Sequence, residues 1–399
     1  MVDGTGADPF RADLRIDDGL ITDIGSAPSG ANTLDVTGCT VTPGLIDAHV
    51  HLGLSSSLQA LLTGNEFSVA QIAADMFENT KRTLLEGFTT VRDCGGIDAG
   101  LPSAIADGTI IGPRVLQCGP IQCQTGGHGH IAPTWEATAV WETHHIPGLC
   151  GLSMLSDSPD EMRKNVRESF RRGAQFIKLC VSGGVVSMHD ALTDTQFTVD
   201  EIAAAVHEAK ARGTYVTVHS HNNEGIRNAL EAGAECIEHG SYLDEDTAKL
   251  MADRGASLVP TVTVIERLVA DSTSAGLPAN IGDRAALVLE SMKQAVLIAR
   301  AAGVRIGLGS DYIGPNQASR GDELVSRASI ESPMQALVSA TKANAEILRI
   351  ADRVGTIGVG MVADLVAWSA DPMSDAKVFA GGERAVVVIQ DGRTVKDVR

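Results

Sequence analysis

The feature that most constrains the fold is an alternation of short apolar runs with longer amphipathic stretches between residues 44 and 350. Many of the amphipathic stretches end in glycine, as helices often do. Regular alternation of strands and helices with short connections predicts βαβ units and a parallel sheet. Eight such units favour a closed (β/α)8 barrel over a doubly wound sheet. The expected strands are residues 45–52, 89–92, 114–118, 176–181, 215–219, 236–239, 257–262 and 305–309.

The two ends of the chain have a different pattern. Residues 1–43 and 360–399 show short alternating runs separated by turn signals such as Asp17-Asp18-Gly19 and Asp391-Gly392. We interpret both ends as strands of one small β domain. The predicted organisation is therefore a terminal domain made of residues 1–43 and 355–399, with a barrel of residues 44–354 inserted between its halves.

Composition and charge exclude several classes of protein. The chain has 32 Lys+Arg against 50 Asp+Glu, a formal charge of −18, which argues against a nucleic-acid partner and against binding to an anionic membrane. No run approaches the roughly 18 consecutive apolar residues of a membrane span, and the first residues lack a signal peptide. The seven cysteines are an odd number and are scattered, as buried thiols in a reducing compartment would be. We expect a cytoplasmic protein.

All eleven histidines lie between His49 and His239, and several stand at the ends of expected strands. His49 and His51 are two positions apart in one strand and therefore point to the same face. His219 and His239 end two later strands, and Asp311 follows the last one. In a closed barrel these side chains meet at the carboxyl ends of the strands, where this architecture builds its active sites. Imidazole nitrogens with a carboxylate suit zinc or a similar first-row metal better than calcium or magnesium.

Lys178 is a charged residue in the otherwise apolar strand at residues 176–181. Four histidines and one aspartate leave two adjacent cations without a bridging anion. A free ammonium would be repelled there, but an amine carboxylated by CO₂ becomes an anionic ligand able to bridge two metals. The alternative is a lysine that extends to the surface or pairs with an acid, which is the commoner fate of a strand lysine.

Taken together, these motifs resemble the amidohydrolase superfamily of metal-dependent hydrolases. The resemblance is greatest to the branch that contains Xaa-Pro dipeptidases, zinc carboxypeptidases acting on C-terminal Arg or Lys, and ochratoxin-degrading amidases. It implies an α/β fold with a TIM barrel of the amidohydrolase type and a small β-sandwich formed by both termini. The matching segments are residues 41–51, 87–93, 125–129, 177–178, 218–219, 238–240, 309–311 and 358–366.

Carried over to this chain, the resemblance implies two divalent metal ions, which we expect to be zinc. One metal would polarise the scissile carbonyl, a hydroxide bridging both metals would attack it, and Asp311 would move the proton to the leaving amine. The ligands implied for one ion are His49, His51 and Asp311, those for the other are His219 and His239, and carboxylated Lys178 bridges both.

The residues that contact the substrate are open between alternatives. Relatives use a histidine in the loop after the third strand, and here this loop holds both His128 and His130. We favour His130 as the catalytic residue that hydrogen-bonds the substrate carbonyl or carboxylate. Tyr242 is positioned to bind a C-terminal carboxylate, and His189 follows the fourth strand within reach of the pocket. Each of the four has the alternative of a loop residue that packs against its neighbours.

The leading functional prediction is an enzyme that hydrolyses the amide bond of a dipeptide, an N-acyl amino acid or a related small substrate with a free carboxylate. The alternatives are a hydrolase of a xenobiotic amide, carbamate or ester, a mononuclear deaminase-like relative that would not need Lys178, and a catalytically silent binding relative. We further expect a homo-oligomer. Specificity depends on the loops at residues 122–156 and 313–320, whose conformations the sequence does not predict.

Overall fold

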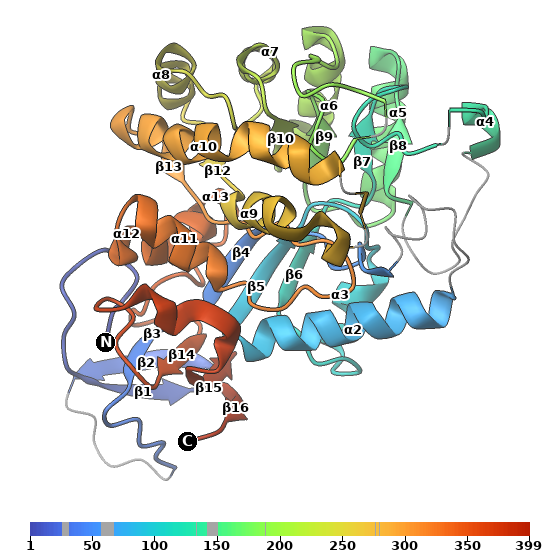
Figure 1. Cartoon of the computed structure of the whole chain (residues 1–399). Helices are drawn as coiled ribbons and strands as arrows, with labels where there is room; N and C mark the ends of the chain where they lie inside the picture. The colour runs from blue at the N-terminus through green and yellow to red at the C-terminus, as the bar shows by residue number, and fades with distance from the viewer. Residues whose placement is uncertain are drawn as a thin grey trace.

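The computed structural model describes residues 1–25, 32–56, 68–132, 134–141, 151–187, 189–275, 277–278 and 280–399. Its centre is built from parallel strands in two sheets (Figure 1). One sheet contains β4 (Leu45–Val50), β5 (Phe88–Asp93) and β6 (Arg114–Gln117). The other has the order β13-β12-β11-β10-β9-β7-β8, with bounds β7 (Ile121–Cys123), β8 (Ser153–Leu155), β9 (Ile177–Cys180), β10 (Val216–Ser220), β11 (Cys236–His239), β12 (Ser257–Val259) and β13 (Arg305–Ile306).

Backbone hydrogen bonds join the two sheets into a closed barrel. The Ala48 amide on β4 donates to the Leu308 carbonyl, just after β13, at 2.9 Å. On the other side, the Gln175 amide before β9 donates to the Gln117 carbonyl on β6 at 2.9 Å. The predicted (β/α)8 barrel is therefore confirmed.

The observed strands differ from the expected ones at their ends. The seventh strand was expected to reach residue 262, but β12 ends at Val259 and a helix begins at Val262. The third strand continues after a break as β7, which pairs with β9 through Gln122 and Leu179. β8, paired with β7, was not predicted, because three residues are too few for an alternating pattern to be recognised.

Helices cover the outside of the barrel (Figure 1). Five of the described helices begin at a side-chain cap in which Ser158, Thr198, Asn222, Asp244 or Ser332 accepts the backbone amide three residues further on. No helix among the described residues is long and apolar enough to cross a membrane. The helices are α2 (Val69–Leu85), α3 (Gly100–Ala106), α4 (Thr138–Trp141), α5 (Pro159–Arg171), α6 (Val199–Ala211), α7 (Asn223–Ala232), α8 (Glu245–Asp253), α9 (Val262–Asp271), α10 (Asn280–Ala301), α11 (Asp322–Ile330), α12 (Pro333–Val338) and α13 (Asn344–Ile347), with the short turns η1 (Ser272–Ala275), η2 (Ser339–Ala343) and η3 (Ala376–Gly382).

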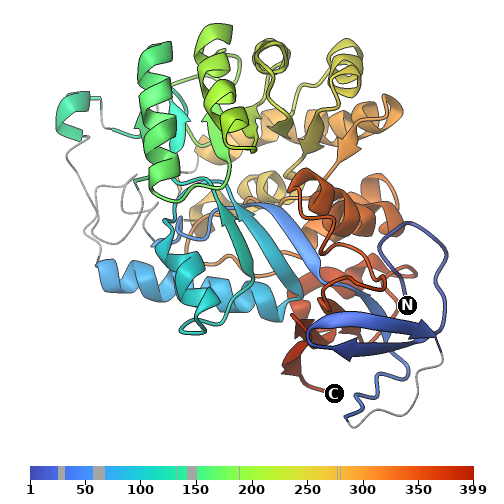
Figure 2. The ribbon, with the colours of Figure 1, turned by 180° about the vertical axis from the view of Figure 1, so that it is seen from behind.

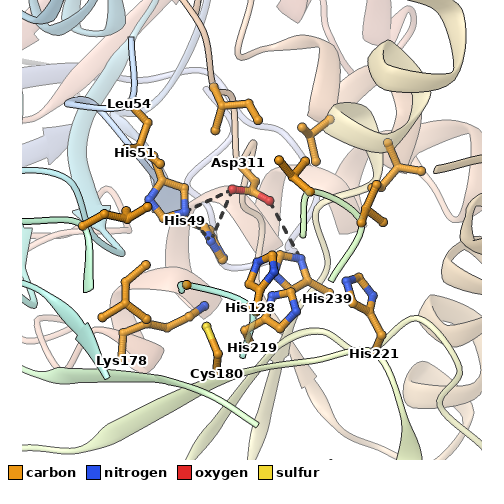
Figure 3. A pocket seen from close by; sticks show the side chains of 18 of the residues that line it. His49, His51, Leu54, His128, Lys178, Cys180, His219, His221, His239 and Asp311 are labelled. Atoms are coloured by element: carbon orange, nitrogen blue, oxygen red, sulfur yellow. Dashed lines mark hydrogen bonds and ion pairs between the residues drawn. The ribbon is translucent and has the colours of Figure 1, made fainter. Parts of the chain in front are cut away.

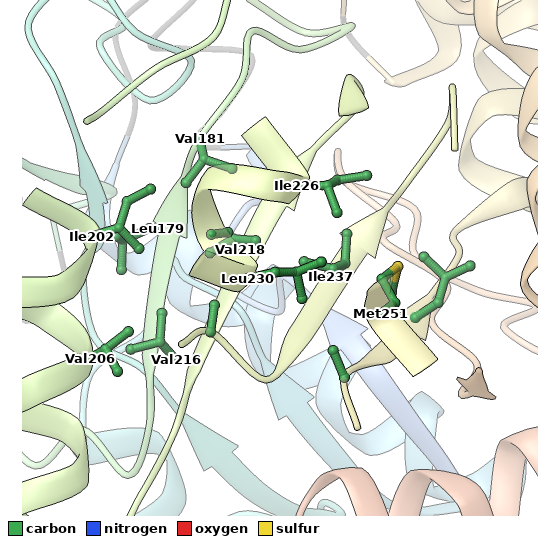
Figure 4. Close-up of a cluster of buried hydrophobic side chains, with 14 of the residues drawn as sticks. Leu179, Val181, Ile202, Val206, Val216, Val218, Ile226, Leu230, Ile237 and Met251 are labelled. Atoms are coloured by element: carbon green, nitrogen blue, oxygen red, sulfur yellow. The ribbon is translucent and has the colours of Figure 1, made fainter. Parts of the chain in front are cut away.

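The largest core cluster lies between the barrel strands and helices α5 to α8 and α10, and Figure 4 shows part of it. Leu179, Val218 and Ile237 on β9, β10 and β11 pack outward against Ile202, Ile226, Leu230 and other helix residues. Because successive strand residues point to opposite faces, their neighbours in sequence point into the barrel. This alternation directs Lys178, His219 and Glu238 away from the outer core.

Both ends of the chain lie beside the barrel and form antiparallel sheets (Figures 1 and 2). β3 (Thr40–Pro43) pairs with β14 (Leu365–Trp368), and β14 pairs with β15 (Ala385–Gln390), which continues to β16 (Arg393–Asp397). A hairpin of β1 (Asp13–Asp17) and β2 (Leu20–Gly25) is bridged to this part of the chain through Leu20 and Val362. The expected β domain made of both termini is confirmed, while its boundaries at 43/44 and 354/355 stay a prediction.

Candidate metal centre

The side chains expected to bind metal lie together in one cavity at the carboxyl ends of the barrel strands (Figure 3). They come from β4, β9, β10 and β11 and from the segment after β13. Parallel strands bring these ends to one rim of the barrel although they are far apart in sequence. The residues brought together are His49, His51, Lys178, His219, His239 and Asp311.

His49, His51 and Asp311 form the tightest part of this cluster. The two histidine Nε2 atoms lie 3.3 Å apart. Asp311 Oδ1 lies 3.4 Å from Nε2 of His49 and 3.3 Å from Nε2 of His51. Each residue thus offers one ligand atom within 4.8 Å of the other two. Three nitrogen and oxygen atoms at this spacing suit a small divalent cation.

His219 and His239 form a second pair next to the first. Their ring centroids are 4.5 Å apart, and the His239 ring lies 5.0 Å from the His49 ring. Asp311 Oδ2 lies 3.9 Å from His239 Nδ1, so this carboxylate stands between the two groups of histidines. His239 Nδ1 is also 2.7 Å from Thr261 Oγ1, a contact that fixes the ring orientation.

Two of the expected ligands have strained backbones. His239 has a φ of 70° and Asp311 a φ of 53°, both in the left-handed region that residues other than glycine seldom adopt. Neighbouring backbone bonds hold them there: the Asp311 amide donates to the His49 carbonyl at 2.8 Å, and the Gly240 amide donates to the Ser220 carbonyl at 2.9 Å. Strain of this kind persists where the surroundings fix it, and it is concentrated at functional sites.

The charge states within the cluster suit metal binding. Burial lowers the pKa of His49 to about 4 and, together with neighbouring cations, holds the pKa values of His219 and His239 well below their usual range. Burial raises the pKa of Asp311, but the nearby His49 and His51 outweigh it and lower that pKa. His51 is the exception among the histidines, because Asp311 raises its pKa against the effect of burial. Neutral imidazoles and an ionised carboxylate are the forms that coordinate cations.

Lys178 lies in the same cavity, and its amine has no partner in the described part of the chain. Its side chain is 2% exposed, and its Nζ atom has no hydrogen-bond partner among the residues that the structure describes. A buried ammonium with no partner is costly, because the charge loses its hydration without compensation. The position therefore fits an amine that is chemically modified, and it fits a divalent metal centre next to it.

Glu238, whose side chain is buried inside the barrel, contacts both His49 and Arg92. Glu238 Oε2 lies 2.7 Å from His49 Nδ1, and Arg92 Nη2 donates to Glu238 Oε1 at 2.5 Å. Burial raises the pKa of Glu238, but the Arg92 guanidinium and the hydrogen bond with His49 lower it, and the net effect is a pKa below the usual range. The ionised Glu238 carboxylate accepts a hydrogen bond from the Nδ1–H group of His49. This bond orients the ring so that its other nitrogen, Nε2, points at Asp311.

Glu238 is not among the site residues predicted from the sequence. A signal was present, because Arg92 and Glu238 carry opposite charges within two strands whose residues are all buried. Charges in such strands are rarely tolerated unless they pair. The pattern does not say which strands face each other, so the contact itself required the structure.

Of the two loop histidines proposed to contact substrate, His128 lines the cavity and His130 does not. His128 stacks on His219 with ring centroids 4.2 Å apart, and its Nδ1 lies 2.5 Å from Ser187 Oγ. His130 accepts the Gly126 amide on its Nδ1 at 2.8 Å. Both histidines were expected to contact the substrate, with His130 favoured; His128 is the one that lines the cavity, and the role of either in substrate binding stays a prediction.

Two other expected substrate residues are also placed outside the cavity lining. His189 Nε2 lies 2.6 Å from the Ala132 carbonyl. The Tyr242 hydroxyl donates to the Leu287 carbonyl on α10 at 3.5 Å. His221 lines the cavity instead, with its Nδ1 2.6 Å from Ser241 Oγ. The direction of a side chain in a loop or at a strand end depends on such local contacts, which the spacing of residues in the sequence does not predict.

Comparison with known proteins places the whole chain in one family. The profile of the amidohydrolase family matches residues 40–398. Ochratoxinase from Aspergillus niger is 33% identical over 415 aligned residues, which cover 99% of this chain and 85% of that protein. The crystal structure of A. niger ochratoxinase has a TM-score of 0.87 at 30% identity, covering 100% of this chain and 94% of that one.

Two further crystal structures are similar along nearly the full length. A prolidase complexed with N-methylphosphonate-L-proline has a TM-score of 0.89 at 35% identity, covering 96% of this chain and 94% of that one. A Xaa-Pro dipeptidase with methionine in its active site has a TM-score of 0.86 at 31% identity, covering 99% and 97%. The barrel, the terminal β domain and these matches agree, and the chain belongs to the amidohydrolase family as a hydrolase acting on carbon–nitrogen bonds.

Proposed function

We propose that this protein is a two-metal hydrolase that cleaves the amide bond of a small substrate such as a dipeptide or an N-acyl amino acid. The observation that carries the proposal is the gathering of four histidines and Asp311 around a buried lysine whose amine has no partner among the described residues. A cluster of surface histidines would not bury an unpaired amine beside them. The relatives named prolidase and Xaa-Pro dipeptidase support a peptide-like substrate.

The donor set supports two cations, for which we propose zinc. Carboxylation of Lys178 would convert its unpartnered amine into an anion that bridges the two ions. Bound divalent cations polarise an amide carbonyl and lower the pKa of water, so that hydroxide is available near neutral pH. The residues proposed for one ion are His49, His51 and Asp311, and those for the other are His219 and His239.

Asp311 is proposed to carry the proton of the reaction. Its carboxylate is ionised and lies between the two groups of histidines, with an 18% exposed side chain that opens to the cavity. When the oxygen of water bonds to the carbonyl carbon, an Asp311 oxygen accepts the released proton. The carbon–nitrogen bond then breaks as the same carboxyl gives the proton to the leaving nitrogen.

His128 is proposed to orient the substrate carbonyl. It lines the cavity, stacks on His219 and is held by Ser187 Oγ at 2.5 Å. Burial lowers the pKa of His128, which favours a neutral ring that hydrogen-bonds without adding charge. A free carboxylate on the substrate, a homo-oligomeric state and a cytoplasmic location remain predictions from the sequence.

A xenobiotic amide is the second candidate substrate. The A. niger relative, 33% identical over nearly the whole chain, is named ochratoxinase. Hydrolysis of such an amide uses the same bond changes and the same Asp311 proton transfer. The two candidates therefore differ in the groups that flank the scissile bond.

A hydrolysis screen of the zinc-loaded protein tests the proposal. The panel contains Xaa-Pro, Xaa-Arg and Xaa-aromatic dipeptides, N-acyl amino acids and an ochratoxin-like amide. We expect turnover of at least one amide, and Asp311→Asn is expected to lower its rate by about 10²-fold or more, because the proton carrier is lost. Asp246→Asn, at a carboxylate with an 86% exposed side chain, is the matched control and keeps the rate. No turnover of any amide by metal-bound protein, or an unchanged rate in Asp311→Asn, would contradict the proposal.

A further inference from the structure

Away from the metal centre, the wall of the cavity is aliphatic. Most of the remaining lining residues are leucine, isoleucine or valine, and among the described lining residues the charged ones are Lys178 and Asp311. Both belong to the candidate metal centre. Representative wall residues are Leu54, Ile121, Leu152, Val264, Leu268 and Ile313.

The aliphatic residues flank the metal centre on two sides. Ile121 lies on β7, in the continuation of the third barrel strand. Val264, Ile265 and Leu268 lie on α9, which follows β12, the seventh strand. Leu152 packs against both Ile121 and the α9 cluster, so the apolar surface continues from one of these segments to the other. An amide bound along this surface would have apolar residues next to both of its flanking groups.

The α9 side of the wall is held in place by its packing within the protein. Val264, Ile265 and Leu268 are 6%, 4% and 3% exposed and pack in one buried cluster with Leu54 and other apolar residues. The start of α9 is tied down because Glu323 accepts the Thr263 amide at 2.7 Å and the Val262 amide at 3.3 Å. A preformed wall selects by fit and polarity without rearrangement.

The guanidinium group of Arg284, next to this wall, already has hydrogen-bond partners within the protein. Arg284 on α10 donates to the carbonyls of Gly184 and Ser187 and, at 3.1 Å, to that of Asp190. It thereby fastens the loop that carries Val185, another wall residue. Its Nη2 atom also lies 3.8 Å from the buried Asp190 carboxylate, so this guanidinium already has both carbonyl and carboxylate partners within the protein.

We propose that the site selects amides with apolar groups on both sides of the scissile bond, and that Val264, Ile265 and Leu268 exclude charged side chains. This inference rests on the proposed amide hydrolysis. A charged group moved from water to an aliphatic wall loses its hydration and finds no partner there, whereas an alkyl or aryl group gains by burial. We therefore expect poor turnover of substrates that have lysine, arginine, aspartate or glutamate side chains next to the scissile amide bond.

Two matched pairs of substrates test the inference with the zinc-loaded protein. N-benzoyl-norleucine and N-benzoyl-lysine differ in charge at nearly equal size on the amine side. Hexanoyl-leucine and 6-aminohexanoyl-leucine differ in charge at nearly equal size on the acyl side. We expect kcat/KM to be at least about tenfold higher for the uncharged member of each pair, within the range that single apolar contacts give. Equal values, or higher values for the charged member, would overturn the inference.

Substitution of the wall tests which residues are responsible. Leu268→Asn keeps the size of the side chain but makes it polar, and it is expected to lower the norleucine-to-lysine ratio of kcat/KM by at least about threefold. A ratio is independent of the fraction of active protein, so partial misfolding does not mimic the effect, and Val264→Thr is the milder second variant. Leu287→Asn, at a leucine that is 67% exposed on α10, is the matched control. If both wall variants keep the wild-type ratio, α9 does not set the selection.

The failure of this inference is distinguishable from failure of the proposed function. Hydrolysis of both members of a pair at equal rates supports amide hydrolysis and overturns only the selection. If no compound is hydrolysed, the proposed function fails, and calorimetric binding of the same compounds still measures the preference of the wall. Tighter binding of the uncharged members would support the apolar selection, and equal or weaker binding would overturn it.

Discussion

Glu238 is a buried residue of the barrel interior that contacts the candidate ligand His49. It lies 2.7 Å from His49 Nδ1 and is paired with the fully buried Arg92. Thr217 Oγ1 also donates to its Oε1 atom. A carboxylate that holds one nitrogen of a ligating histidine fixes the tautomer and orients the other nitrogen toward the metal. We therefore regard Glu238 as a positioning residue.

Replacement Glu238→Gln is expected to weaken metal binding by about 10- to 100-fold, the range typical for partners of metal-binding histidines. It also leaves the Arg92 charge unpaired, so the free energy of unfolding is expected to fall by about 3–5 kcal/mol. Metal affinity is measured by competition with a chromophoric chelator at a temperature where both proteins are folded.

The control for this substitution is Glu331→Gln, which breaks another buried ion pair. Glu331 Oε1 lies 2.6 Å from Arg327 Nη2, and the two side chains are 3% and 0% exposed. This variant is expected to lose stability but to keep its metal affinity. Equal metal affinities in wild type and Glu238→Gln would mean that Glu238 has only a structural role.

At this scale the sequence predicts which histidines lie together better than which loop side chains line the cavity. His49 and His51 were predictable because strand geometry alone sends positions two apart to one face. His128 and His130 are also two apart, but they lie in a loop, where local bonds decide the direction of each ring. The backbone of a loop has no fixed period, so the sequence could not predict that His128 and not His130 lines the cavity.

Among the elements, the closure between the first and last barrel strands depends on Asn344. Its Nδ2 atom donates to the Ile46 carbonyl at 2.7 Å and to the Leu308 carbonyl at 2.8 Å. Its Oδ1 atom accepts the Leu308 amide at 3.0 Å. The side chain is fully buried at the start of α13 and supplies bonds that a strand would otherwise make.

Replacement Asn344→Ala is expected to lower the free energy of unfolding by at least about 2 kcal/mol, because it leaves buried backbone groups without partners. Chemical denaturation measures the loss. Asn316→Ala, at an exposed asparagine, serves as the control and is expected to change little. A loss below about 0.5 kcal/mol in Asn344→Ala would show that water or other groups replace these bonds.

The contact between α9 and α11 predicts a pH dependence. Glu323 on α11 is buried, and burial raises its pKa to about 8 against the lowering effect of Arg327 and Thr263. Its value in an unfolded chain is near 4.5. Between these two values the unfolded chain releases this proton while the folded protein retains it. The contribution of Glu323 to stability is therefore present below pH 4.5 and decreases as the pH rises toward 8.

Glu323→Gln removes this titration while keeping an acceptor for the α9 amides. Relative to the wild type, the variant is expected to gain stability as the pH rises from 5 to 8, by up to about 1.4 kcal/mol per pH unit. Denaturant unfolding of both proteins at several pH values checks this. Glu290→Gln, with an 81% exposed side chain, controls for the general effect of losing one acid. Parallel pH profiles for wild type and Glu323→Gln would be incompatible with this account.

The sequence predicts the element types well but their ends less well. Recurrent apolar runs and glycine stops identified the barrel strands and helices, because both signals arise within a few neighbouring residues. The three-residue β8, the split third strand and the early start of α9 at Val262 depend on contacts with distant segments. Local sequence patterns do not predict contacts between segments that are distant in the sequence.

For the whole molecule, the barrel and the terminal domain follow from the order of the elements along the chain. Closure of the ring turns dispersed strand ends into one cavity, and the candidate ligands at residues 49, 219, 239 and 311 meet for that reason. The aliphatic wall was not predictable, because it combines segments such as those around Leu54, Leu152 and Val264. The sequence therefore specifies the candidate metal centre more fully than the surface that would select a substrate.

The measurement that tests the account most directly is the number of zinc ions bound per chain, by elemental analysis of protein saturated with zinc in bicarbonate buffer. We expect two ions per chain in the wild type, and at most one in Lys178→Met together with loss of most amide hydrolysis. Lys210→Met, at an exposed lysine on α6, is expected to retain two. Two ions and a normal rate in Lys178→Met would contradict the account, because the buried amine would then have no part in holding the metals.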